Sequence, residues 1–505
     1  MLFAVPAQAK WREASSDHFV IYSQSSERTL RRFSENLERY HSAMELLTNT
    51  QPSIPSPSNR VTIYDVGDED EVQDLYGAGA QFIVGYYRPA AGNTVAFVPD
   101  LRTSSTSRSQ GVLLHEYAHH FMISKSSRAM PRWLSEGGAE FFASAEFKNS
   151  GELSIGRPAN HRAYELMRAA QVSIEELLDE EKYRSKEHRG FDAFYGRSWL
   201  LYHMLTFDDA RRGQLAAYWS ALAQGMAALP AAQHAFGSLE QLDKDLDSYL
   251  RKRRMKTFFL NSEMTRVGPI TIRTLSEGMD EMMPLHIRSR NGVDDEAAAE
   301  LVEDARRIAA EYPGDPGVLS ALAEAEFDAG FDDAAIAAAD KALALDSTLV
   351  NAHVQKGYAL YRKAENAASG EDRAELYNIA IAAFTALNRI ENDHPIPLIF
   401  YYRSFEDRGL PPSETARHGL ERAAILAPYD KSLWFELVQM LAMEGKIALA
   451  SELVKSLTSD PHGGGLTSAA SFLAAQLDDA PEGQPLHVDW KVYVPVEENE
   501  VPEVG

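Results

Sequence analysis

The stretch GVLLHEYAHHFMI, residues 111–123, decides the fold of the first half of this chain. It is apolar with helical periodicity and contains His115-Glu116-Tyr117-Ala118-His119, an H-E-x-x-H motif. Residues four apart share one helix face, about 6 Å along the axis, so His115 and His119 can bind one metal ion. Glu116 projects to the neighbouring side, where it can act as a base. The alternative, a core helix without metal, is costly because it buries several polar groups.

A third ligand follows in the segment PRWLSEGGAE, residues 131–140, which begins a second predicted helix. Glu136 lies 17 positions beyond His119, as expected if this helix packs back against the first. The small residues that follow it, Gly137 and Gly138, would let the two helices approach closely. The alternative for Glu136 is an exposed carboxylate favoured by the helix dipole. The three ligands predict one Zn²⁺ per chain, although a His₂Glu site also accepts Co²⁺ or Mn²⁺.

H-E-x-x-H followed by W-L-x-E-G-x-A-E resembles the gluzincin zinc metallopeptidases, especially the aminopeptidase-N-like and peptidase-MA-like families. The resemblance covers residues 10–260 and depends on about 35 of them. It implies a thermolysin-like fold with zinc on His115, His119 and Glu136, and Glu116 as the catalytic base. It also implies that Glu140, one turn beyond Glu136, orients a ligating histidine. The alternative for Glu140 is an ordinary surface carboxylate.

The same resemblance suggests a tyrosine that stabilises the oxyanion, about sixty residues after the third ligand. Tyr195, in FYGRSWLL (194–201), lies 59 positions after Glu136 and is the candidate, with a packing aromatic as the alternative. His203 is a weaker candidate. The G-x-M-E-N element that holds a free amino terminus in aminopeptidases does not occur in residues 61–111. This absence favours an endopeptidase.

The pattern of the first 270 residues is α+β. Strands are predicted at 18–22, 61–64, 82–87 and 94–98, where β-branched and aromatic residues gather between turn residues. Helices are predicted at about 27–47, 107–125, 131–147 and 191–207. Strands first and helices afterwards indicate a metallopeptidase domain over residues 10–270, followed by a connector at 271–293.

Residues 294–465 are helical, Ala-rich and repetitive. Ala323 is matched by Gly357 one 34-residue period later, and two further copies follow, with Ala416 and Gly445 at their small positions. The period resembles the tetratricopeptide repeat, an all-α solenoid that presents a groove to a protein or peptide. A non-repeating helical bundle is the alternative. Residues 466–505 are predicted to be a tail, partly disordered, with a strand at 487–494.

Charge and composition exclude some classes of function. The formal net charge of -24 argues against nucleic acid and anionic membranes as partners. No cysteine is present, which excludes thiol chemistry and Cys-ligated zinc. No window is apolar and long enough to span a bilayer. Residues 1–9, MLFAVPAQA, end like a signal-peptidase site and predict an exported protein if they are a signal-peptide remnant, and a cytoplasmic one otherwise.

These observations predict a zinc-dependent peptidase whose repeats bind a peptide or protein substrate or a protein partner. Glu116 would take a proton from the attacking water and deliver it to the leaving amine. The main alternative is a catalytically inactive scaffold of tetratricopeptide type, with a degenerate or structural zinc domain. A zinc hydrolase acting on another amide or an epoxide is a third interpretation.

Overall fold

The computed structural model describes residues 10–101, 107–125, 130–185, 192–368, 370–458, 464–488 and 490. The chain divides into two compact units that interleave along the sequence. Unit 1 comprises the residues up to 38 together with 53–101 and 268–433, and unit 2 comprises 39–52, 102–267 and the residues from 434 on. Both units therefore include parts of the predicted amino-terminal domain. The predicted signal-peptide remnant lies outside the described residues, as does most of the strand predicted at 487–494.

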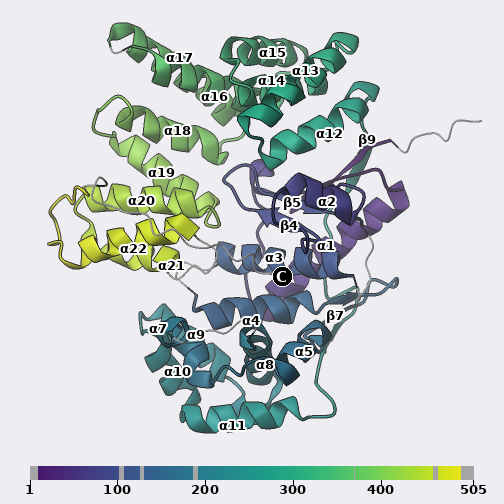
Figure 1. The fold of residues 1–505 in the computed structure, drawn as a ribbon, viewed down its shortest axis with the longest axis vertical. Coiled ribbons are helices and arrows are strands. Elements are labelled where there is room, and N and C mark those ends of the chain that lie inside the picture. Colours follow the sequence, from purple (N-terminus) through teal and green to yellow (C-terminus); the bar gives the residue numbers. More distant parts are fainter. Residues whose placement is uncertain are drawn as a thin grey trace, which may run out of the picture. The chain divides into compact units, whose positions relative to one another are not determined.

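A six-stranded mixed sheet belongs to unit 1 (Figure 1). Its strand order is β4-β5-β3-β2-β1-β9, with β2, β3 and β5 parallel and the other pairs antiparallel. Alternation along β2 buries Phe19 and Ile21, as the predicted strand requires. The sheet is completed by β9, which is far from the other strands in the sequence and pairs with β1. The strands of this sheet are β1 Arg12–Ser15, β2 Phe19–Ser23, β3 Val61–Asp65, β4 Tyr86–Arg88, β5 Val95–Val98 and β9 Thr271–Thr274.

Unit 2 contains a smaller antiparallel sheet and the helices that carry the candidate site. In that sheet β7 (Leu153–Ile155) lies between β6 (Glu146–Phe147) and β8 (Phe258–Leu260). The central helix is α4 (Arg132–Ala143), which packs on α3 (Arg108–Lys125) and on α8 (Phe194–Phe207). Trp133, Phe141 and Phe142 of α4 are almost completely buried. Their burial explains why this amphipathic segment forms the centre of the unit.

Helical repeats make up most of the remainder of unit 1. Each helix from α12 to α19 packs against the next, and α14 also packs on α12 and on α16 (Figure 1). Packing between successive first helices is the mark of a stacked repeat. The helices are α12 Glu277–Asn291, α13 Asp295–Glu311, α14 Pro316–Asp328, α15 Asp332–Leu345, α16 Val350–Asn366, α17 Glu371–Ile390, α18 Pro395–Glu406 and α19 Glu414–Leu426. The solenoid of tetratricopeptide type predicted for residues 294–465 is confirmed, and α12 lies in the segment that was predicted to be a connector, residues 271–293.

Local signals start and space these helices. Asp315 caps α14 by accepting hydrogen bonds from the backbone N–H groups of Gly317 and Val318, and Pro316 occupies the first turn. Small residues lie where the helices touch: Ala323 is fully buried, and the ring of Phe384 on α17 packs directly over Gly357. The repeat signature therefore marks the closest helix–helix approaches.

The fourth predicted copy corresponds to α20 (Lys431–Met443) and α21 (Ile447–Thr458), most of which fall in unit 2. A further helix, α22 (Gly464–Asp478), packs on α21, in the segment predicted to begin the tail. No helix among the described residues has the length and apolar character needed to cross a bilayer. The other helices are α1 Glu27–Thr48, α2 Glu69–Tyr76, α5 Ala163–Arg168, α6 Ile174–Leu178, α7 Glu180–Ser185, α9 Gln214–Ala223, α10 Ala228–Phe236 and α11 Leu239–Leu250, with short 3₁₀ turns at Pro57–Asn59, Asn160–Arg162 and Asp209–Arg211.

Gly357→Ala tests the close approach of α16 and α17. A Cβ at Gly357 would lie 2.3 Å from the buried ring of Phe384, so we expect a loss of about 1–3 kcal/mol in the free energy of unfolding. Gly419→Ala on α19 is the matched control, because its Cβ would meet nothing closer than 3.6 Å. The control should be neutral or stabilise by up to about 1 kcal/mol. Urea midpoints followed by circular dichroism measure both, and equal midpoints for the two variants would contradict the packing.

Candidate metal centre

Helix α3 brings the two histidines of the motif onto one face. His115 and His119 are one turn apart, and their ring centroids are 4.7 Å apart. The part of α1 that belongs to unit 2 holds this helix: the Tyr40 hydroxyl donates to the carbonyl of Leu114 at 3.0 Å, and His41 Nδ1 lies 2.7 Å from the Tyr117 hydroxyl. The apolar face of α3 is thus anchored while the histidines point toward α4.

Three possible metal-ligand atoms meet at one point. His115 Nε2 and His119 Nε2 are 3.0 Å apart, and Glu136 Oε2 lies 3.4 Å from the first and 3.2 Å from the second. Glu136 is 2 % exposed, and both histidine side chains are largely buried. Among the described residues, this is the single group of three or more His and carboxylate side chains close enough to hold a metal ion.

The separations of these atoms fit a tetrahedral ion. With bonds of about 2.0–2.1 Å to nitrogen and oxygen, the ligand atoms of tetrahedral Zn²⁺ lie about 3.3 Å apart. The other ring nitrogens have oxygen neighbours: Glu140 Oε1 is 3.4 Å from His115 Nδ1, and Ser135 Oγ is 3.0 Å from His119 Nδ1. If each Nδ1 donates its proton there, both Nε2 lone pairs and the Glu136 carboxylate face one another. Such an arrangement repels itself unless a cation lies between the three atoms.

The electrostatics of His115 lead to the same conclusion. Burial lowers the pKa of this imidazole, but the hydrogen bonds with Glu136 and Glu140 outweigh that effect and raise the pKa to about 10. Two buried carboxylates therefore require a positive charge at this position, which either a proton or a metal ion can supply. Burial would raise the pKa of Glu140, yet the contacts with His115, His161 and Arg162 hold it well below its usual range.

Glu140 has two further partners that the sequence did not reveal. His161 Nε2 lies 2.6 Å from Oε2 of Glu140, and the guanidinium of Arg162 donates to Oε1 at 2.6 and 3.1 Å. Both come from the 3₁₀ turn Asn160–Arg162, 21 and 22 residues beyond Glu140. A contact between residues this far apart in the sequence leaves no periodic pattern. The only sign of it in the sequence is the adjacent pair His161-Arg162.

Glu116 is partly exposed and makes no hydrogen bond or ion pair with the described residues. It follows His115 directly on α3, so it lies at the edge of the ligand cluster and not within it. A carboxylate in this position can accept a proton from a water or substrate that approaches the three ligands.

Tyr195 lies near the cluster, separated from it by arginines. The guanidinium of Arg162, which holds Glu140, lies 4.8 Å from the centroid of the Tyr195 ring, and Arg132 donates to its hydroxyl at 3.5 Å. The next residue, Gly196, donates its N–H to Glu165 at 2.5 Å, which fixes the start of α8. One series of contacts connects Tyr195 to the ligand cluster, through Arg162 and Glu140. Its role with an oxyanion stays a prediction.

The glycines after Glu136 allow closer packing than the sequence indicated. A Cβ at Gly138 would lie 2.9 Å from Met122 on α3, and a Cβ at Gly137 would lie 2.4 Å from the backbone carbonyl of Ser198 on α8. One glycine therefore admits α3, as predicted, and the other admits α8. Helices α3 and α8 therefore contact α4 directly after Glu136, at the two residues that have no side chain.

His203 belongs to the core of unit 2. Its side chain is fully buried, with Nδ1 at 2.9 Å from the Tyr249 hydroxyl and Nε2 near the carbonyls of Gly156 and Lys256, at 3.0 and 3.1 Å. Burial lowers the pKa of this imidazole to about 4, although the backbone hydrogen bonds oppose the shift. His203 is therefore a neutral structural histidine, away from the ligand cluster.

The depressed pKa of His203 predicts a loss of stability in mild acid. Between pH 6.5, the pKa in the unfolded chain, and about 4, the unfolded state binds a proton that the folded state does not. The free energy of unfolding should fall through this window by up to about 3 kcal/mol. His203→Gln should reduce the slope of the urea midpoint against pH, whereas His234→Gln, an exposed control on α10, should keep it. An unchanged slope in His203→Gln would rule out this assignment.

Among known proteins, the solved structures that match this chain are helical-repeat proteins. No family model matches the chain, and no curated protein is similar to it. Among solved structures, a tetratricopeptide protein of Thermus thermophilus matches at 17% identity and a TM-score of 0.31, over 40% of this chain and 96% of that one. MamA matches at 15% identity and a TM-score of 0.27, over 40% and 99%, and a MamA double mutant at 15% and 0.28, over 36% and 94%. Similarities this weak assign no activity.

The predicted membership of the gluzincin metallopeptidases is wrong. The comparisons return tetratricopeptide-type proteins, and neither a family model nor a curated relative supports a peptidase domain or the labels of hydrolase, protease and zinc protein. The physical reason is that about 35 residues carried the resemblance, and these specify two packed helices and their ligands. They do not specify the sheet, which residues 271–274 complete from beyond the predicted domain. The repeat part of the resemblance is the part that is supported.

Proposed function

We propose that this protein binds a divalent metal ion at His115, His119 and Glu136 and uses the site to hydrolyse a peptide bond. The observation that carries the proposal is the triangle of ligand atoms, 3.0–3.4 Å apart, with the Nδ1 atoms of both histidines next to oxygen atoms. The proposal concerns this site and does not depend on membership of a family. Zn²⁺ suits the donor set best, because two imidazoles, one carboxylate and an open fourth position are typical of catalytic zinc.

Zinc bound there would supply Lewis acidity, which lowers the pKa of water toward neutrality and polarises a carbonyl group. The chain's own residues would do the rest. Glu116, partly exposed and without a polar partner among the described residues, accepts the proton of the attacking water and returns it to the leaving amine. Glu140, held by Arg162 and His161, keeps the His115 ring oriented.

The helical repeats support a second role, in binding proteins. Stacked helix pairs such as α14–α19 present an extended inner surface made by successive first helices. This architecture also supports the second candidate function, a protein-interaction scaffold without catalysis, in which the metal cluster is structural. Glu116 has no polar partner among the described residues and lies next to a ligand in the sequence, which favours catalysis, because a structural site has no use for a base.

Glu116→Gln separates the two functions. If Glu116 is the base, zinc-loaded wild type should cleave a denatured protein such as casein, or a fluorogenic peptide library. The variant should lose about 100-fold or more of that activity while it retains its metal. Glu152→Gln, an exposed carboxylate in the same unit, should remain fully active. Equal activity of Glu116→Gln and wild type would exclude the base, and no cleavage by metal-loaded wild type would leave the scaffold function.

A further inference from the structure

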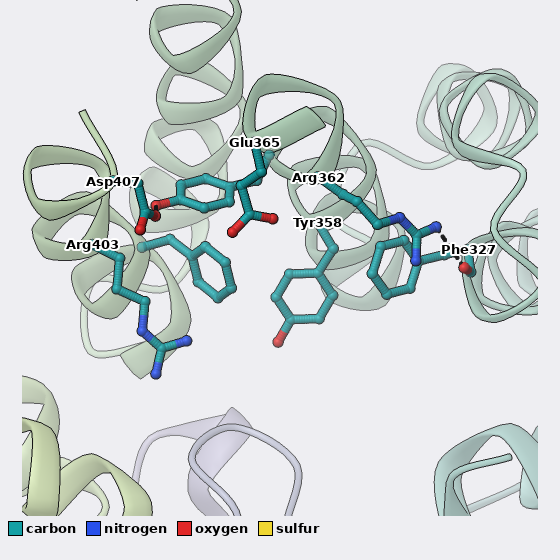
Figure 2. A pocket seen from close by; sticks show the side chains of 8 residues that line it. Phe327, Tyr358, Arg362, Glu365, Arg403 and Asp407 are labelled. Atoms are coloured by element: carbon teal, nitrogen blue, oxygen red, sulfur yellow. Dashed lines mark hydrogen bonds between the residues drawn. The ribbon is translucent and has the colours of Figure 1, made fainter. Parts of the chain in front are cut away.

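The repeats of unit 1 contain a cavity of about 280 Å³. All of its lining residues come from three consecutive first helices, α14, α16 and α18, or from Asp407, which directly follows α18 (Figure 2). No residue of the second helices α15, α17 or α19 lines it. The cavity is therefore a recess in the inner surface that stacked first helices form. Its volume is below the range of about 300–1,000 Å³ that is usual for small-molecule sites, so it suits a single side chain.

Aromatic rings form the wall of this recess. Tyr358 lies between Phe327 and Phe400, with ring centroids 5.6 and 5.2 Å away. Each ring comes from a different repeat, so the wall exists only because the three repeats stack. The faces of aromatic rings carry negative electrostatic potential and attract cations. Two guanidinium groups already exploit this property: Arg362 lies 3.9 Å from the centroid of Phe327 and Arg403 lies 5.4 Å from that of Phe400.

The charged groups of the recess differ in their hydrogen-bond partners. Arg362 donates to the carboxylate of Asp332 at 2.6–2.8 Å and to the carbonyl of Phe327 at 2.6 Å. Asp407 accepts a hydrogen bond from the Tyr361 hydroxyl. By contrast, the Glu365 carboxylate has no hydrogen bond or ion pair within the described parts of the chain. Burial and the nearby Asp407 raise its pKa, and the charges of Arg403, Arg373 and Arg362 oppose that shift only in part.

Figure 2 shows the Glu365 carboxylate directed into the space beside the Tyr358 ring, and the Tyr358 hydroxyl at the opposite end of that ring. The Tyr358 hydroxyl also makes no hydrogen bond with the described residues. One carboxylate and aromatic faces therefore border a volume that holds one side chain. The lining holds two carboxylates, Glu365 and Asp407, and two guanidinium groups, of Arg362 and Arg403. A cation would meet in Glu365 a carboxylate without a hydrogen bond or ion pair among the described residues, next to a ring face.

We propose that this recess binds the lysine or arginine side chain of an extended segment of a protein partner. The ammonium or guanidinium group would donate to Glu365, and its aliphatic stem would lie along Tyr358 and Phe400. The inference rests on the proposed protein-binding role of the repeats and is independent of the metal site.

The test uses the full-length protein and an array of random dodecapeptides. We expect wild type to retain peptides enriched in Lys or Arg next to an apolar residue, with retention that falls as ionic strength rises. Glu365→Gln should weaken binding of these peptides about tenfold, and Tyr358→Leu should weaken it further. Glu375→Gln removes the same charge from an exposed position on α17, outside the recess, and should bind like wild type. Circular dichroism confirms that each variant is folded.

The remaining outcomes overturn the inference in distinguishable ways. If Glu365→Gln and Tyr358→Leu retain the same basic peptides as wild type, the repeats bind peptide but the recess does not. If the retained peptides are acidic and Arg403→Gln loses them, the recess binds an anion instead. If no peptide is retained, the protein-binding role of the repeats fails together with the recess, while the metal site is unaffected.

Discussion

Electrostatic repulsion among three electron-pair donors is the constraint on which the functional half of unit 2 depends. His115 Nε2, His119 Nε2 and Glu136 Oε2 are held within 3.4 Å of one another in a largely buried place. Three such atoms stay together only if a proton or a metal ion compensates them and the surrounding helices cannot separate. Two features of the unit supply that rigidity. Tyr40 anchors α3 by a hydrogen bond, and α4 packs tightly at Gly137 and Gly138.

The carboxylate of Glu140 extends this constraint outward. It faces His115 on one side and accepts hydrogen bonds from Arg162 on the other, and Arg162 in turn lies against the ring of Tyr195. Arg162 therefore contacts both the carboxylate that orients His115 and the ring of Tyr195, the candidate oxyanion residue. Changes at Arg162 should therefore affect the cluster of His115, His119 and Glu136 without touching any of the three. In unit 1 a different principle applies, because the recess is formed by stacking repeats and not by one rigid helix pair.

Local patterns predicted the parts of the fold that local physics determines. Strands β2, β3 and β5 and helices α3 and α8 begin and end within a few residues of their predicted bounds, because burial alternates or repeats along them. The predicted strand at 82–87 is shorter and later, at Tyr86–Arg88, following Gly85, which lies close to the backbone of β5. Strands β1 and β9 were missed, because four-residue segments rich in polar side chains show no clear strand pattern; β1 gains its place by pairing with β2 and β9, and β9 by pairing with β1.

The candidate site shows the same division. The proximity of three of its residues could be predicted, because helical spacing places His115 and His119 together and a short connection returns Glu136 to them. The contacts of Glu140 with His161 and Arg162 could not, since they depend on how a distant 3₁₀ turn packs. The family could not be predicted either, because a metal site built from two helices can occur in more than one fold.

The metal content of the purified protein tests the central claim most directly. Zinc is offered, excess is removed by dialysis, and zinc per chain is measured by elemental analysis on wild type, Glu136→Ala and the exposed control Glu152→Ala. The account predicts about one zinc per chain in wild type and in the control, and a large loss in Glu136→Ala, since two imidazoles alone bind weakly. Wild type without zinc, or Glu136→Ala with as much zinc as wild type, would contradict it.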